Sequence, residues 1–329
     1  DLIRDGGFDA YRFSFAWPRI IPEGTGAVNP AGLDFYDRLI DGMLERGIKP
    51  YATLYHWDLP SALQDRGGWM NRDIAGWFAD YATLVAEKFG DRLHATATIN
   101  EPWCVAFLSH YLGVHAPGYR DLRAAARAMH HVLFAHGTAV DALRAAGAKN
   151  LGIVLNLEKS EPATDSEADR DAAGFGDALF NRWYLGGICK GQYPAELTEW
   201  LAPYLPEDYQ RDMEVVSRPL DWLGINYYTR GLYKASSQPG RPVERVEGPL
   251  EKTDIGWEIY PQGLTDLLVR VSREYTRIPL YVTENGMAEV EGDDDPRRTR
   301  YYEDHLKAVL AARAEDADVR GYFAWSLLD

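Results

Sequence analysis

The 329-residue chain has only two cysteines, Cys104 and Cys189, and it has no long hydrophobic run. A globular chain of this size gains little from one disulfide bridge, so we expect two free thiols. No apolar stretch approaches the roughly 20 residues that a transmembrane helix requires. Nothing near the start resembles a signal peptide, although the chain opens on "DLIRDGG", within an apparent helix, and we expect an N-terminal segment to precede it. We therefore expect a cytoplasmic protein, while the missing start leaves a signal peptide open.

The chain also has fewer basic than acidic residues. The chain has 35 Lys and Arg residues against 50 Asp and Glu residues, which gives a formal net charge of −15 at pH 7. Such a chain is repelled by the phosphates of nucleic acids and by anionic lipid head groups at neutral pH. We therefore expect neither a nucleic acid nor a membrane surface as a partner.

The sequence motifs of several common cofactor sites are missing. The segment after the first predicted strand reads "AWPRIIPEG" and contains no G-x-G-x-x-G turn, which argues against a dinucleotide-binding Rossmann domain. The chain contains neither a P-loop nor an H-E-x-x-H motif, and it has no Cys and His cluster with the spacing of a zinc site.

What the chain does contain is an alternation of short β-rich runs and long amphipathic helices. No Gly/Ser-rich linker divides it, so the alternation predicts one parallel sheet with helices on its faces. Helical patterns, one of which begins with an acidic cap at Asp121, occupy residues 73–90, 121–147, 263–275 and 298–314. The seven predicted strands cover residues 10–17, 49–57, 94–100, 151–157, 221–228, 278–284 and 319–325.

The residues at the strand ends distinguish a closed barrel from an open, doubly wound sheet. In a barrel, catalytic groups come from the carboxyl ends of several strands and meet at one mouth. Nearly every predicted strand here ends in polar or aromatic residues that bind or react, and this pattern favours the barrel. These residues are Arg12, Trp17, His56, Trp57, Asn100, Glu101, Asn226, Tyr228, Glu284 and Trp325.

Two of these residues, Glu101 in "TINEP" and Glu284 in "VTENG", suggest a paired-carboxylate active site. Glycoside hydrolysis needs one protonated carboxyl group and one ionised carboxylate. The surroundings of the two groups must therefore give them different pKa values. Arg12 and Tyr228 would hold Glu284 ionised, so we predict that Glu284 is the nucleophile. The charge of Glu284 would favour a proton on Glu101, which we predict to be the general acid and then the base. The alternative, that each is a capping or salt-bridging residue, stays open at this point.

Six motifs in order resemble the family-one glycoside hydrolases, the β-glucosidase group of retaining enzymes. They are "YRFSFAWPRI", "TLYHWDLP", "TINEPW", "GINYYT", "YVTENG" and "YFAWSLLD", and the resemblance runs from residue 1 to 329. It implies a (β/α)8 TIM barrel, with residues 1–329 as a single catalytic domain that lacks the first strand and the C-terminal part of the last unit. It also implies double displacement through a covalent glycosyl-enzyme, with no metal and no organic cofactor.

The same resemblance assigns roles around the two glutamates. By motif position Glu101 matches the acid/base of the family and Glu284 its nucleophile. Trp57 and Trp17 are open to two interpretations, contact with substrate or packing in the core. The implied sugar-binding residues are His56 and Asn100 for hydroxyl groups, Asn226 and Tyr228 beside the nucleophile, Trp325 as the stacking floor, Trp103 as a wall of the leaving-group site, and Trp57.

Two other groups of residues suggest a metal site only weakly. His130, His131 and His136 lie along one predicted helix, where exposed or hydrogen-bonded side chains are a better interpretation than metal ligands. The acidic run "EGDDDP" at 291–296 is predicted to be a solvated loop, with calcium binding as the weaker alternative.

The substrate implied by the resemblance is a short β-linked oligosaccharide or an aryl or alkyl β-glycoside, with a glucosyl, galactosyl or fucosyl group at its non-reducing end. Ten Trp and twenty Tyr residues suit a cleft that stacks on sugars. Alternatives are a 6-phospho-β-glycosidase, a carbohydrate-binding barrel without catalysis, and an unrelated aldolase or isomerase with a Lys base. The oligomeric state is not predicted.

Overall fold

The structure is a computed structural model that describes residues 1–238, 242–290 and 295–327. The chain forms two compact units. The first comprises residues 1–155 and 200–223, and the second comprises residues 156–199 and 224–329. The chain passes from one unit to the other within three elements, which are β4 (Leu151–Asn156), α9 (Ala195–Leu201) and β6 (Trp222–Asn226).

The first unit is built on a parallel sheet, in the order β1-β2-β3-β4. Strands β2 and β3 are buried along almost their whole length, as expected for parallel strands covered on both faces. The start of β6 lies beside β4, because the Asp221 N–H donates to the Leu151 carbonyl oxygen at 2.8 Å. The other strands are β1 (Ala10–Ser14), β2 (Lys49–Tyr55) and β3 (Ala95–Asn100).

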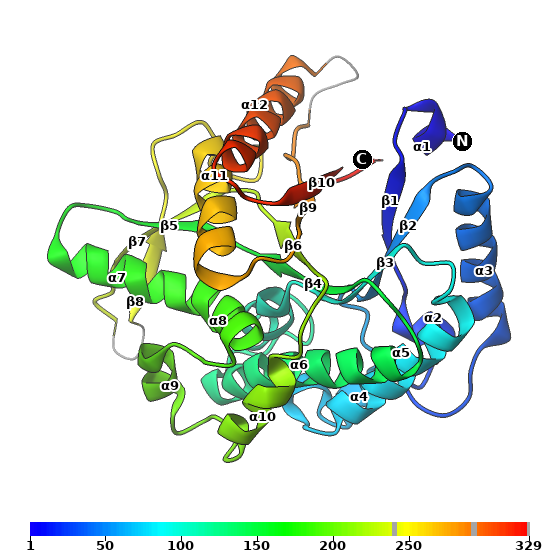
Figure 1. Ribbon diagram of the computed structural model, residues 1–329. Helices are drawn as coiled ribbons and strands as arrows, with labels where there is room; N and C mark the ends of the chain where they lie inside the picture. Colours follow the sequence, from blue (N-terminus) through cyan, green and yellow to red (C-terminus); the bar gives the residue numbers. More distant parts are fainter. Residues whose placement is uncertain (239–241, 291–294, 328–329) are drawn as a thin grey trace. The chain divides into compact units, whose positions relative to one another are not determined.

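Helices cover this sheet, and the long helices α5 and α6 pack against each other (Figure 1). The carboxylate of Asp121 accepts a hydrogen bond from the Ala124 N–H at 2.7 Å, which confirms the predicted cap of α6. The helical elements are α1 (Leu2–Asp5), α2 (Trp17–Ile20), α3 (Pro30–Leu44), α4 (Ser61–Asp65), η1 (Gly68–Met70), α5 (Ile74–Phe89), η2 (Cys104–Leu108), α6 (Leu122–Ala145) and α10 (Tyr209–Val216).

The second unit contains the strand order β6-β9-β10 and a separate three-stranded sheet, β5-β7-β8. Helix α7 packs on β5 and β7, and α11 packs on α12 (Figure 1). Its strands are β5 (Lys159–Pro162), β7 (Arg230–Ala235), β8 (Val243–Val246), β9 (Leu280–Asn285) and β10 (Val319–Ala324). Its remaining helical elements are α7 (Glu167–Asp177), η3 (Ala178–Arg182), α8 (Trp183–Lys190), α11 (Pro261–Arg270), η4 (Val271–Tyr275) and α12 (Pro296–Ala314).

The seven predicted strands are confirmed as β1, β2, β3, β4, β6, β9 and β10, and the four predicted helical segments are confirmed within a few residues of their ends. The three-stranded sheet was not predicted. Polar groups hold it: Arg245 lies 3.1 Å from the buried Glu158 carboxylate, to which the Tyr233 hydroxyl also donates. Both cysteines are free thiols, as predicted. No helix in the described part of the chain is long and apolar enough to cross a bilayer.

Part of the predicted acidic loop, residues 291–294, lies outside the described residues. Of the last two residues of that run, Asp295 precedes helix α12 and Pro296 is helical, so the loop prediction is wrong for Pro296. The carboxylate of Asp295 caps α12 by accepting a hydrogen bond from the Arg298 N–H at 2.8 Å, and Pro296 is the first residue of the helix.

The three histidines of α6 are all buried, so the exposed alternative is wrong for them and the hydrogen-bonded one is confirmed. The helix is enclosed by α5, η1 and α10. His130 Nε2 lies 2.9 Å from an Asp212 carboxylate oxygen, His131 Nδ1 lies 3.1 Å from the Trp69 carbonyl oxygen, and His136 Nδ1 lies 2.6 Å from Thr98 Oγ1. The described residues include no group of three His, Cys, Asp or Glu side chains that could hold a metal ion.

Burial has a consequence for the stability of the fold in acid. Desolvation lowers the pKa of both His131 and His136 to about 3. A histidine in the unfolded chain has a pKa of about 6.5. Below pH 6.5 the unfolded state therefore binds protons that the folded state does not bind, and the free energy of unfolding falls until the pH reaches about 3.

We predict that His136→Gln weakens this pH dependence. The slope of the unfolding free energy against pH should decrease by up to about 1.4 kcal/mol per pH unit between pH 6 and pH 4, because one buried titrating group is removed. Urea unfolding at a series of pH values measures the slope. The matched control is Thr98→Val, which removes the same hydrogen bond and keeps the imidazole, so it should lower stability without changing the slope. Equal slopes in the wild type and His136→Gln would contradict this account.

Candidate active site

Two strand ends of the first unit have strained backbones. Trp57, just after β2, has a φ of 83°, and Glu101, directly after β3, has a φ of 51°. Non-glycine residues rarely adopt this left-handed region, and those that do often lie at functional sites. The Glu101 N–H donates to the Val154 carbonyl oxygen at 2.9 Å, which continues the pairing of β3 with β4 up to this residue. The strain thus marks two of the positions that the sequence singled out.

Asn100 links two other predicted residues. Its Oδ1 accepts a hydrogen bond from Arg12 Nη2 at 2.6 Å, and its Nδ2 lies 3.3 Å from His56 Nε2. An amide nitrogen can only donate, so His56 Nε2 is the acceptor and the ring proton is assigned to Nδ1. Burial, aided by the positive charge of Arg12, lowers the pKa of His56 to about 3. His56 is therefore a neutral imidazole of defined tautomer.

The tryptophans of the first unit fall into two classes. Trp17 is fully buried, as expected for a core residue, whereas the Trp57 side chain is 38% exposed, so core packing is wrong for Trp57. The backbone of Trp57 has left-handed angles just after β2, and its Nε1–H donates to the Asn100 carbonyl oxygen at 3.0 Å. Trp103 is half-buried, with its ring centroid 5.8 Å from that of Phe107.

The second unit contains Glu284 in a comparable position. This residue is buried near the carboxyl end of β9, and the Tyr228 hydroxyl donates to its Oε2 at 2.7 Å. The Tyr227 N–H also donates to the Glu284 carbonyl oxygen at 3.0 Å. The backbone and the side chain of Glu284 are therefore both held by the residues that follow β6.

Hydrogen bonds between side chains fix the strand ends around Glu284. Thr283 Oγ1 donates to Asn226 Oδ1 at 2.7 Å, so the two strands are joined beside the carboxylate. Asn285 Nδ2 donates to the Tyr227 carbonyl oxygen at 2.6 Å, and the Trp325 N–H donates to the Asn285 carbonyl oxygen at 2.9 Å. The Trp325 side chain is 46% exposed and offers an aromatic face at the end of β10.

Two candidate residues were missed by the sequence analysis. The Trp257 side chain, in the connection between β8 and α11, is 41% exposed, and its ring centroid lies 5.4 Å from that of Tyr228. Cys104 donates through Sγ to Glu101 Oε2 at 3.2 Å. Trp257 follows no strand and could be suspected only from the excess of aromatic residues. For Cys104 the available signal was its position three residues after Glu101 at the start of a helix.

The predicted site residues thus form two clusters, one in each unit. Arg12 and Glu284 belong to different units, and support of Glu284 by Arg12 stays a prediction. The first cluster comprises Arg12, His56, Trp57, Asn100, Glu101 and Trp103, and the second comprises Asn226, Tyr228, Glu284 and Trp325.

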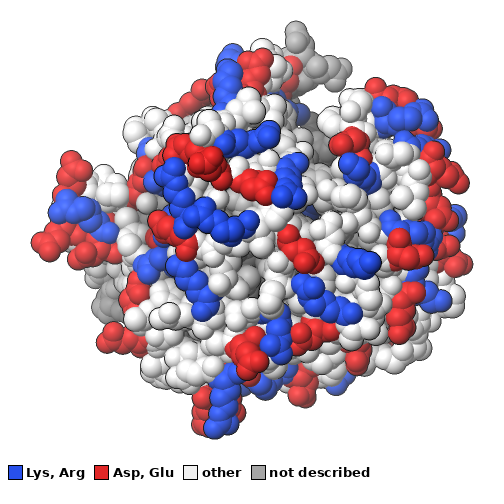
Figure 2. Space-filling view, viewed as in Figure 1, with Lys and Arg blue, Asp and Glu red and all other residues white. Residues whose placement is uncertain are grey.

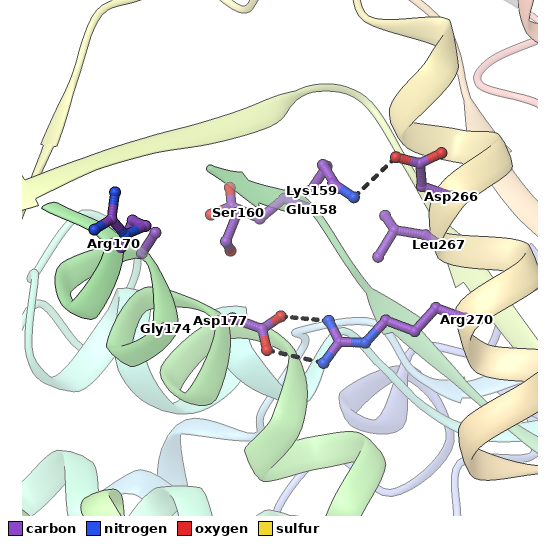
Figure 3. A pocket seen from close by; sticks show the side chains of 10 residues that line it. Glu158, Lys159, Ser160, Arg170, Gly174, Asp177, Asp266, Leu267 and Arg270 are labelled. Atoms are coloured by element: carbon purple, nitrogen blue, oxygen red, sulfur yellow. Dashed lines mark hydrogen bonds and ion pairs between the residues drawn. The ribbon is translucent and has the colours of Figure 1, made fainter. Parts of the chain in front are cut away.

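Each unit also contains a cavity away from these clusters. In the second unit a cavity of about 310 Å³ lies between α7, β5 and α11 (Figure 3). Four of its charged residues form two pairs: Lys159 lies 2.8 Å from Asp266, and Arg270 binds Asp177 through two hydrogen bonds of 2.7 and 2.9 Å. In the first unit a cavity of about 870 Å³ is lined by residues within 86–94 and 146–150, which lead into β3 and β4. It lies at the opposite ends of these strands from Glu101.

Charge on the molecular surface is mixed. On the face drawn in Figure 2, acidic and basic side chains are interspersed, and the Lys and Arg residues described there do not gather into a broad patch. That face therefore presents no strip of positive charge along which a polyanion could bind.

Known proteins resemble this chain over its full length. It matches glycosyl hydrolase family 1 over residues 1–329. It is 46% identical to β-glucosidase A of Thermotoga maritima, with all of this chain and 76% of the relative aligned. It is also 46% identical to a β-glucosidase of Agrobacterium sp., with 74% of that relative aligned. A bifunctional β-D-glucosidase/β-D-fucosidase of Bifidobacterium breve is 42% identical, with all of this chain and 77% of the relative aligned.

Solved structures give the same result for the fold. The family 1 β-glucosidase of T. maritima in complex with isofagomine lactam has a TM-score of 0.94 at 45% identity, covering 99% of this chain and 75% of that one. The AHE enzyme of Alicyclobacillus herbarius also has a TM-score of 0.94 at 45% identity, with the same coverage of both chains. The predicted TIM-barrel fold is confirmed, and the chain belongs to glycosyl hydrolase family 1.

Proposed function

We propose that this protein is a retaining β-glycosidase that hydrolyses terminal non-reducing β-D-glucosyl residues. Its substrates are short β-linked oligosaccharides and aryl or alkyl β-glucosides. The observation that carries the proposal is the full-length match to glycosyl hydrolase family 1, together with relatives named as β-glucosidases at 46% identity. The relative named as both a glucosidase and a fucosidase supports acceptance of fucosyl groups as well.

Glu284 is the nucleophile of the proposed reaction. Its carboxylate attacks the anomeric carbon and forms a covalent glycosyl-enzyme, while the bond to the leaving-group oxygen breaks. The phenol of Tyr228, 2.7 Å from Oε2, supports an ionised carboxylate and holds it in one orientation. Additional support from the positive charge of Arg12 is part of the proposal.

Glu101 is the proton donor in the first step and the base in the second. It gives its proton to the departing oxygen, and it then takes a proton from the water that attacks the anomeric carbon and releases Glu284. Retention requires the two carboxyl groups to be about 5 to 5.5 Å apart. We therefore propose that both units belong to one catalytic domain, residues 1–329, whose mouth holds both glutamates.

The remaining residues bind the sugar. His56 is proposed to bind a hydroxyl group of an uncharged pyranose as a neutral imidazole, without bringing a charge of its own. Asn100 is proposed to face the 2-hydroxyl, where hydrogen bonds strengthen in the transition state. Trp325 provides the stacking floor beneath the ring. The leaving group is proposed to lie against Trp103 and Trp257. Trp57 and Asn226 are the other residues that we propose to bind the substrate.

The alternatives receive less support. A carbohydrate-binding barrel without catalysis has no need of two buried glutamates at strand ends, each held by a hydrogen bond from its own unit. A 6-phospho-β-glycosidase needs a basic clamp for the phosphate, and the guanidinium of Arg12 is instead bound to Asn100. The two free thiols support the cytoplasmic location that we propose.

Glu284→Gln should lower the rate of 4-nitrophenyl β-glucoside hydrolysis by at least about a thousandfold, because an amide cannot form the covalent intermediate. Release of nitrophenol measures the rate, and NMR of the wild-type reaction should show β-glucose as the first product. The matched control is Glu199→Gln, which changes an exposed glutamate of α9 and should leave the rate unchanged. Equal rates for the wild type and Glu284→Gln would remove the nucleophile assignment.

Glu101→Ala should slow substrates with poor leaving groups by about 10²- to 10⁴-fold and activated dinitrophenyl glucosides far less, because only poor leaving groups require the proton. Azide should restore turnover and yield β-glucosyl azide, since the small anion attacks the glycosyl-enzyme without a general base. Rates on a series of aryl β-glucosides, with product analysis by chromatography, test this. Uniform slowing without an azide product would show that Glu101 is not the proton donor.

A further inference from the structure

Cys104 lies directly against the carboxyl group of Glu101. The left-handed backbone of Glu101 ends the path of β3, and the chain then enters the helical segment that contains η2. Glu101 directly precedes this helical segment, and the third residue of a helix lies beside the residue that precedes the helix. The thiol three residues after Glu101 is thereby brought back beside the carboxyl group, where Sγ donates to Oε2 at 3.2 Å.

Burial strengthens the hydrogen bond between the Cys104 thiol and the Glu101 carboxyl group. The side chains of Glu101 and Cys104 are buried, at 6% and 7% exposed. Hydrogen bonds are electrostatically stronger in such an environment than in water, and a carboxyl group that must act at one position gains from a fixed neighbour. A thiol is also a small, polarisable group, and here it places a hydrogen-bond donor beside the carboxyl group without adding a charge.

We propose that Cys104 is a positioning residue for the proton donor. The thiol binds Oε2 and so restricts the rotation of the Glu101 carboxyl group, which favours one orientation of that group toward the glycosidic oxygen. This inference rests on the proposed role of Glu101 as the proton donor. It adds that the Cys104 thiol orients the carboxyl group that carries the proton. The second cysteine, Cys189, lies on α8 in the other unit and takes no part.

The test compares Cys104→Ala, Cys104→Ser and the matched control Cys189→Ala on two substrates. Cys104→Ala should lower kcat about tenfold for a glucoside with a poor leaving group, and less than about twofold for 2,4-dinitrophenyl β-glucoside, because only the first depends on proton donation. KM should change less than about twofold for both. Cys104→Ser keeps a donor and should recover most of the loss, and Cys189→Ala should match the wild type.

Two outcomes would overturn the proposal. The first is an unchanged kcat in Cys104→Ala, and the second is an equal loss for both substrates, which would indicate packing alone. Glu101→Ala is measured in parallel. If that variant shows no dependence on the leaving group, the proposed function itself fails, and this result is distinguishable from a failure of Cys104 alone.

A second measurement covers the case in which Cys104→Ala does not fold. In the Cys189→Ala background Cys104 is the one remaining thiol, and its S–H stretching band is observed by infrared spectroscopy. Adding Glu101→Gln or Glu101→Ala should shift this band to higher frequency, more strongly for Ala, because the acceptor is weakened or removed. A band at the same frequency with and without the glutamate would show that the thiol does not bind the carboxyl group.

Discussion

One backbone hydrogen bond, from the Glu101 N–H to the Val154 carbonyl oxygen, sets the geometry of the first unit's cluster. It extends the pairing of β3 with β4 to a residue that already has left-handed backbone angles. Strand β3 therefore ends at a defined residue. Asn100 is its last residue, and Glu101 lies just beyond its carboxyl end. Asn100 binds both Arg12 of β1 and His56, which follows β2. The position at which β3 ends therefore also fixes these two side chains.

The second unit achieves a similar result with different bonds. Glu284 lies inside β9 rather than after it, so its carbonyl oxygen takes part in pairing with the chain after β6 while its side chain is held by Tyr228. Asn285 then binds the Tyr227 carbonyl oxygen through its side chain. An amide side chain thus ties adjacent strand ends together beside each glutamate, Asn100 in one unit and Asn285 in the other. Beside each glutamate, hydrogen bonds to these amides therefore fix where the strands end.

The predictable parts of this protein were those that depend on repeated hydrophobic runs. Strands β2, β3, β4 and β6 are buried along almost their whole length, and their apolar residues made them visible together with the polar residues at their ends. The sheet β5-β7-β8 was not visible, because short polar runs such as "KSEP" and "VERV" owe their structure to partners distant in sequence, Glu158 with Arg245 among them. Trp257 and Cys104 were missed for a related reason. Their importance comes from what they contact, which spacing alone does not reveal.

The proposed chemistry depends on which of the groups at these strand ends carry a charge. His56 is neutral because burial and the nearby guanidinium lower its pKa to about 3. The hydrogen-bond partners described above for His56 and Glu284 are an amide, that of Asn100, and a phenol, that of Tyr228. Such groups offer hydrogen bonds to an uncharged sugar without adding a titration of their own near neutral pH. Arg12 is the exception, and its bond to Asn100 fixes its position. A neutral imidazole is a poor proton donor, so in the proposed mechanism the proton reaches the leaving group from Glu101 and not from His56.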